Sequence, residues 1–200
     1  MSTKTNKKSK NAAVLGMFIA LIVVLQALSF VIPPISGASL SFVLIPIVLA
    51  AVMYGTKYST ITGLSFGIIV TLISILGLDS IGYAYFVYSP IIAILLILTK
   101  GIVAGLGAGI VSSLLKKKNL YLATISTAAI TPILNTAIFI LGTLLFFIPA
   151  LEDYFQKENI DLTIKAFLVG IILVNFVVEF IINIVLAPAI LRVTKAILKK

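Results

Sequence analysis

Residues 89–118 read SPIIAILLILTKGIVAGLGAGIVSSLLKKK, and this stretch decides the fold that we expect for the whole chain. It is an apolar run of membrane length that ends in a lysine triplet. Lys100 stands near its middle, where a charge costs roughly 2.5–3.5 kcal/mol on insertion scales, so it normally faces a bundle interior. Gly101, Gly105 and Gly109 recur every four residues and predict a face against which another helix packs closely.

The composition of the whole chain indicates a membrane protein. Of its 200 residues 61% are hydrophobic and 10% are charged, which is far from the composition of a soluble domain. We expect an all-α polytopic bundle of six transmembrane helices, with residues 1–10 as a disordered basic tail and 11–200 as a single domain. The net charge of +9 does not indicate nucleic acid, because the lysines fall at the ends of apolar runs.

The limits of the six helices follow from the apolar runs and from the prolines and glycines between them. We expect helices over residues 11–32, 40–54, 60–78, 90–118, 120–148 and 164–191. Between them we expect a linker over 33–39, a tight turn over 55–59 and loops over 79–89 and 149–163.

The distribution of basic residues predicts the orientation in the membrane. With six spans, twelve of the fifteen Lys and Arg residues fall on the side that carries both termini. Since basic residues concentrate on the cytoplasmic side, we expect a multi-pass protein of the cell membrane with a cytoplasmic N-terminus and C-terminus.

Polar side chains inside the apolar runs mark the candidate site. Lys100, Asn135 and Glu179 fall at similar depths, ~15 Å or somewhat more from the outer end by helical rise. An ion pair of Lys100 with Glu179, hydrogen-bonded by Asn135 and Asn175, would offset the cost of burying either charge alone. Thr131 lies one turn before Asn135. This set is either a polar clamp that joins three helices or the lining of a pocket for a small solute, open to the outside.

Two further sets of residues have a structural and a functional interpretation. Tyr85 and Tyr88 precede a helix entrance, where tyrosines anchor a chain at the membrane surface or form a lid that stacks on a ligand. Ala12, Gly16 and Ala20 form a stripe of small residues on the first helix. Such a stripe serves internal packing or the docking of another membrane subunit.

The sequence argues against an enzyme. It contains no His and no Cys, which removes the commonest general base and the thiolate metal ligands. A Walker-type phosphate loop is also absent, and Glu179 is the one acid expected inside the membrane, so no carboxylate pair is available for acid–base work. We therefore expect no catalytic residue, no metal site and no cofactor.

Three stretches resemble the substrate-binding S components of energy-coupling factor (ECF) vitamin transporters. SFVLIPIVLAAVMYGTKYSTITGLSFGIIVTLIS, residues 41–74, is similar to their second and third helices. TKGIVAGLGAGIVSSLLKKK, residues 99–118, is similar to the fourth, and PILNTAIFILGTLLFF, residues 132–147, to the fifth. Together with the six-helix layout, the resemblance extends over nearly the whole chain.

The resemblance implies partners and a mechanism. Proteins of this family bind a vitamin on the extracellular side, beneath the first, third and fifth loops. They then topple in the bilayer on a transmembrane T subunit, driven by two cytoplasmic ATPases. Their first helix docks on the T subunit through small residues, and Ala12, Gly16 and Ala20 match that spacing with glycine in the middle place.

The residues also bear on which vitamin would bind. The absence of Trp counts against a site resembling the tryptophan-lined one of the thiamine subgroup. A buried lysine with amide neighbours suits a small carboxylate, so pantothenate is the first choice. Riboflavin is the second, because tyrosines and amides could stack on and bond to a flavin. Two other classes stay open: a structural membrane protein with polar glue, and a stand-alone carrier coupled to protonation of Glu179.

Overall fold

The computed structural model of the chain describes residues 2–31, 42–158 and 163–198, so the expected linker over 33–39 lies outside the described residues. The elements follow in the order α1 (Ser2–Val31), α2 (Leu44–Tyr54), α3 (Thr56–Ile75), α4 (Ser80–Tyr88), α5 (Pro90–Lys116), α6 (Leu120–Gly142), a π-helical segment η1 (Thr143–Phe147), α7 (Ile148–Lys157), α8 (Ile164–Ala166), a second π-helical segment η2 (Phe167–Ile172) and α9 (Leu173–Leu198). The expected all-α class is confirmed.

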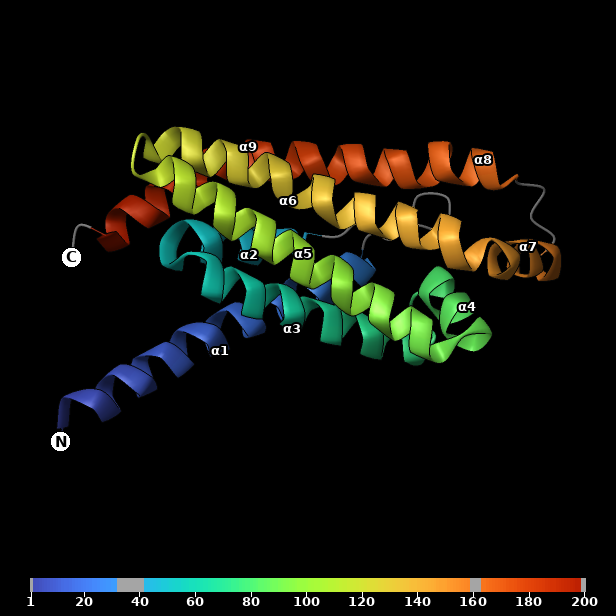
Figure 1. Cartoon of the computed structure of the whole chain (residues 1–200), viewed down its shortest axis with the longest axis horizontal. Helices are drawn as coiled ribbons and strands as arrows, with labels where there is room; N and C mark the ends of the chain where they lie inside the picture. Colours follow the sequence, from blue (N-terminus) through green and yellow to red (C-terminus); the bar gives the residue numbers. More distant parts are fainter. Residues whose placement is uncertain (1, 32–41, 159–162, 199–200) are drawn as a thin grey trace.

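The lengths of the helices fit a protein with several membrane spans. In the described part of the chain, five helical stretches are long and apolar enough to cross a membrane, and α2 is a shorter apolar helix. Both termini lie at one end of the bundle, and α4 and α7 lie at the other end (Figure 1). We call these the terminal end and the cap end.

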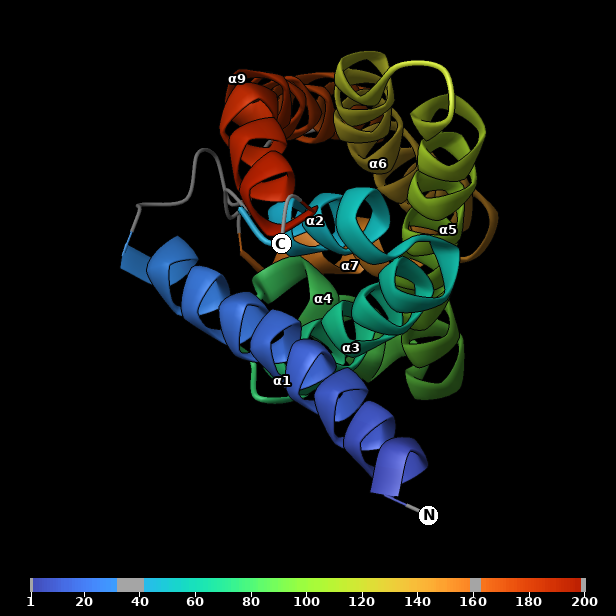
Figure 2. The ribbon, with the colours of Figure 1, turned by 90° about the vertical axis from the view of Figure 1, so that its left-hand side faces the viewer.

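The short helix α2 occupies the interior of the terminal half of the bundle. It contacts α3, α5, α6 and α9, which surround it when the molecule is viewed from the terminal end (Figure 2). Its side chains are almost all apolar and buried, with Ile47 and Val48 completely inaccessible. Gly55 ends it with a φ of 83°, a conformation that favours glycine. Lys116 of α5 then donates a hydrogen bond of 2.8 Å to the backbone oxygen of Val52, near the carbonyl end of α2.

The helices α3 and α5 pack against each other through glycines, as the spacing on α5 predicts. A Cβ atom added to Gly101 would collide with the backbone oxygen of Gly63, and one added to Gly105 would collide with that of Ser59. Gly109 meets the backbone of Thr56 in the same way. Because these neighbours are backbone atoms, only glycine allows the two helices to approach this closely.

Four sequence expectations about local structure are wrong. The expected turn over 55–59 is reduced to Gly55, since α3 already begins at Thr56. Helix α1 begins at Ser2, so the expected disordered tail continues the first helix. The expected loop over 79–89 contains α4, which buries Ile81 and Tyr85.

The fourth correction concerns the acidic segment expected as a loop over 149–163, because it begins with the amphipathic helix α7. Ala150, Leu151 and Phe155 are buried on one face of α7, while its acidic residues are exposed. The apolar spacing, rather than the acidic composition, determines the structure here.

Candidate functional site

The side chain of Lys100 points into the bundle. Its Nζ atom lies 5.0 Å from the centre of the Phe139 ring of α6 and 5.8 Å from that of the Phe66 ring of α3. An ammonium group over aromatic faces is stabilised by their quadrupoles. Lys100 itself is half-buried. Within the described residues, its ammonium group makes these two ring contacts and neither a hydrogen bond nor an ion pair.

Two carboxyl groups act on Lys100 through space. Asp79, which immediately precedes α4, and Glu179 of α9 both interact electrostatically with its ammonium group. The expected direct ion pair between Lys100 and Glu179 is not formed. In the described part of the chain, Asp153 and Lys157 are the one pair of opposite charges within 4.0 Å of each other. Asp79 was not expected at the site, although its place between the third and fourth spans is a signal that could have identified it.

Three side chains on one face of α9 form a row of buried oxygen acceptors. Asn183 is completely buried, and its amide nitrogen donates a hydrogen bond of 2.8 Å to the backbone oxygen of Glu179. Asn175 lies one turn on the other side of Glu179 and its side chain interacts with the carboxylate. Asn175 Oδ1, Glu179 Oε2 and Asn183 Oδ1 have no hydrogen-bond partner among the described residues, and we call them the acceptor row.

Helix α6, which packs against α9, also carries buried polar side chains. Asn135 is buried, and its Oδ1 also has no hydrogen-bond partner within the ranges that the structure describes. It stands one turn before Phe139, whose ring lies beneath the Lys100 ammonium group. Thr131 is completely buried, and its hydroxyl donates to the backbone oxygen of Thr127 at 2.7 Å, so its proton is already used within α6.

The two tyrosines expected at the site lie at the cap end in different surroundings. Tyr85 is 1% exposed and stacks on Phe147, with ring centres 4.2 Å apart and an interplanar angle of 7°. Its hydroxyl group lies 2.9 Å from that of Thr143. Burial raises the pKa of the Tyr85 phenol, which therefore stays protonated. Tyr88 is exposed and touches Phe147 edge-on.

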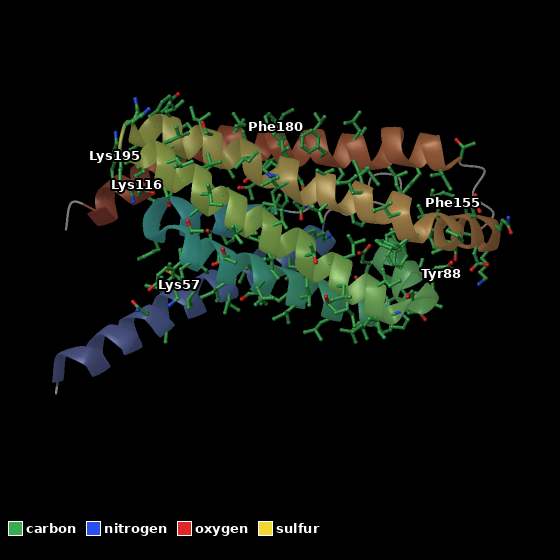
Figure 3. All side chains as sticks on the ribbon, viewed as in Figure 1. Lys57, Tyr88, Lys116, Phe155, Phe180 and Lys195 are labelled. Atoms are coloured by element: carbon green, nitrogen blue, oxygen red, sulfur yellow. The ribbon has the colours of Figure 1, made fainter. Side chains whose placement is uncertain are left out.

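The side-chain view separates three levels of the bundle (Figure 3). Lys57, Lys116 and Lys195 lie at the terminal end, whereas Tyr88 and Phe155 lie at the cap end. Phe180, the neighbour of Glu179, lies between the two. The part of α9 that carries Glu179 therefore lies between the two ends of the bundle.

The small-residue stripe of α1 faces away from the bundle. Ala12, Gly16 and Ala20 are exposed, and no heavy atom of the described residues lies within 4 Å of a Cβ atom added to Gly16. Helix α1 instead packs through Phe18 and Ile22, which are buried. Internal packing is thus ruled out as the role of this stripe in the described part of the chain.

The comparison with known protein families finds a match. The family model described as "ECF transporter, substrate-specific component" matches residues 10–191, which is most of the chain. Neither the search of curated proteins nor that of solved structures returned a match.

Proposed function

The chain belongs to the family of ECF transporter substrate-specific components, and from this membership we propose that it captures a vitamin from outside the cell. A component of this family binds the substrate of a transporter and is not itself an enzyme. The family implies a partner T subunit and ATPases. ATP hydrolysis by two such partner ATPases would drive uptake of the bound vitamin.

The orientation that we propose has the terminal end in the cytoplasm and the cap end outside. Lys57, Lys116 and Lys195 gather at the terminal end (Figure 3), and basic residues concentrate on cytoplasmic surfaces. The exposed acidic residues of α7 lie at the cap end, together with α4. A substrate would then enter from the cap end, past Tyr88 and the stacked ring of Tyr85.

The observation that carries the proposal is the Lys100 ammonium group inside the bundle, which has no direct anionic partner among the described residues. A charged side chain inside the membrane raises the free energy of the folded protein unless a group of opposite charge or a hydrogen-bond acceptor pairs with it. A carboxylate on the substrate supplies one, and pantothenate is the vitamin that we propose first on this ground. A charge-assisted hydrogen bond of this kind contributes ~1.5–3 kcal/mol, which corresponds to about 10- to 150-fold in affinity.

Riboflavin is the second candidate, and a different observation favours it. Tyr85, Phe139 and Phe147 form a stacked aromatic group beside Lys100, whose ammonium group contacts the Phe139 ring, and the ring centres of Tyr85 and Phe139 are 5.9 Å apart. A flavin ring could replace one of these contacts. Its polar edge would then reach Asn135.

The exposed stripe on α1 supports docking on the T subunit. Ala12, Gly16 and Ala20 leave a flat surface on which another helix could pack at close range. The helix is otherwise lined there by exposed apolar side chains such as Met17, Val23 and Val24, which suit either lipid or a protein partner.

Equilibrium binding to the purified chain tests the proposed substrate. We expect saturable binding of pantothenate at one site per chain, measured by calorimetry in detergent, with riboflavin measured in parallel by the quenching of its fluorescence. Binding of riboflavin alone would replace the first candidate by the second. If neither vitamin binds, the substrate assignment is wrong.

A further inference from the structure

We propose that the acceptor row of α9 selects substrates by their hydrogen-bond donors, so that hydroxyl or N–H groups of the guest are required for tight binding. The inference rests on the proposed function and adds the chemical class of the substrate: a small molecule rich in donors, carrying at most one anionic group. The observations behind it are the orientation of the side chains on α9, the charges around them and their burial.

The orientation of the two asparagines is determined by what their amide nitrogens contact. Asn183 uses its Nδ2 atom for the 2.8 Å bond to the backbone of Glu179, so its Oδ1 atom is the end that remains available. Asn175 interacts with the carboxylate of Glu179, which accepts hydrogen bonds only, so its amide nitrogen faces that group. Its Oδ1 atom is then also directed away, and the row presents oxygen atoms throughout.

The spacing of the row fits an extended small molecule. Its three residues are four apart on one helix, so neighbouring side chains are displaced by ~6 Å along the axis and the whole row spans ~12 Å. Asn135 adds a fourth acceptor from α6, since its Oδ1 is likewise buried without a partner in the part of the chain described. A guest lying along α9 meets several acceptors in succession.

The burial of these atoms makes them selective. Glu179 is 3% exposed and Asn183 is completely buried, so water does not replace a missing partner easily. A site built to bond a substrate hydroxyl or N–H rejects the analogue that lacks it by up to 10⁴–10⁵-fold, because its own polar atoms are then left unpaired. Lys100 contributes a single ammonium group, which suits a guest with one negative charge rather than several.

Two measurements test the proposal, and the first needs no substrate. Glu179→Gln replaces one oxygen of the row by an N–H donor without changing the size of the side chain. We expect the melting temperature of the substrate-free variant to be unchanged or to rise by ~2–4 °C, since the change removes a buried acidic group and adds a donor among unpaired acceptors. The matched control is Glu152→Gln on the exposed face of α7, which should leave the melting temperature unchanged. A clear fall for Glu179→Gln alone would show that the row already has donors and would overturn the proposal.

The second measurement uses a matched pair of ligands. Pantothenate carries hydroxyl groups that N-(3,3-dimethylbutanoyl)-β-alanine lacks, while both have the same carboxylate and amide. We expect the wild type to bind pantothenate at least 100-fold more tightly, and Glu179→Gln to reduce this ratio at least tenfold. An equal affinity for both ligands, or a ratio unchanged by Glu179→Gln, would refute donor selection. If pantothenate does not bind at all, the proposed substrate fails, and the melting temperatures still decide whether the row lacks donors.

Discussion

Replacement of Gly101 by Ala places a methyl group against backbone atoms that have no rotamer to change. Its Cβ would meet the carbonyl oxygen of Gly63, with the carbonyl carbon of Gly63 at 3.2 Å and the backbone nitrogen of Gly67 at 3.3 Å. The helices α3 and α5 must therefore separate. Overpacking of this kind costs ~1–3 kcal/mol, against which alanine gains up to ~1 kcal/mol in helix propensity.

The net loss that we expect for Gly101→Ala is about 1–2 kcal/mol, which lowers the melting temperature by ~2–8 °C for a chain of this size. The assay is thermal unfolding of the protein purified in detergent. The matched control is Gly16→Ala, because no heavy atom of the described residues lies within 4 Å of its added Cβ, so that variant should be as stable as the wild type or slightly more stable. Equal stability of Gly101→Ala and Gly16→Ala would refute the close packing of α3 on α5.

Three further substitutions have defined outcomes in the same unfolding assay or in purification. Tyr85→Phe removes the 2.9 Å hydroxyl contact at the cap end and should cost ~1 kcal/mol, whereas Tyr83→Phe at an exposed position should cost nothing measurable; equal effects would contradict a structural role for that contact. Lys116→Met removes the donor at the end of α2 and should lower the melting temperature by a few degrees more than the same change at exposed Lys117, and the reverse order would count against it. Gly16→Leu should leave the chain folded and reduce co-purification with the T subunit at least tenfold; undiminished co-purification would show that α1 docks elsewhere.

The long apolar runs made the membrane spans predictable, because helix type follows directly from length and hydropathy in lipid. The short helices were not predictable in the same way. In α4 and α7 the stabilising contacts are tertiary: Tyr85 stacks on Phe147, and Phe155 packs against Phe167 with ring centres 5.5 Å apart. The acidic residues of α7 are exposed, so their presence in the sequence does not predict the buried apolar face that Leu151 and its neighbours form.

In the candidate site, too, some features could be predicted from the sequence and others depend on tertiary contacts. The common depth expected for Lys100 and Glu179 follows from counting residues along straight helices, and Phe180, next to Glu179, lies between the two ends of the bundle. The rings of Phe66 and Phe139 beneath the ammonium group depend on how α3 and α6 are rotated about their axes, which the sequence does not report. Asp79 was overlooked although its place between the third and fourth spans is visible in the sequence, because its electrostatic interaction with Lys100 depends on the three-dimensional arrangement.

The central claim is that the ammonium group of Lys100 binds the vitamin inside the membrane. The most direct measurement is the affinity for pantothenate of Lys100→Met, a change that keeps an unbranched side chain of nearly the same length and removes its charge. We expect an affinity about 10- to 150-fold below that of the wild type, with Lys57→Met at the terminal end unchanged and all three proteins folded by their melting temperatures. An affinity of Lys100→Met equal to that of the wild type would contradict the account.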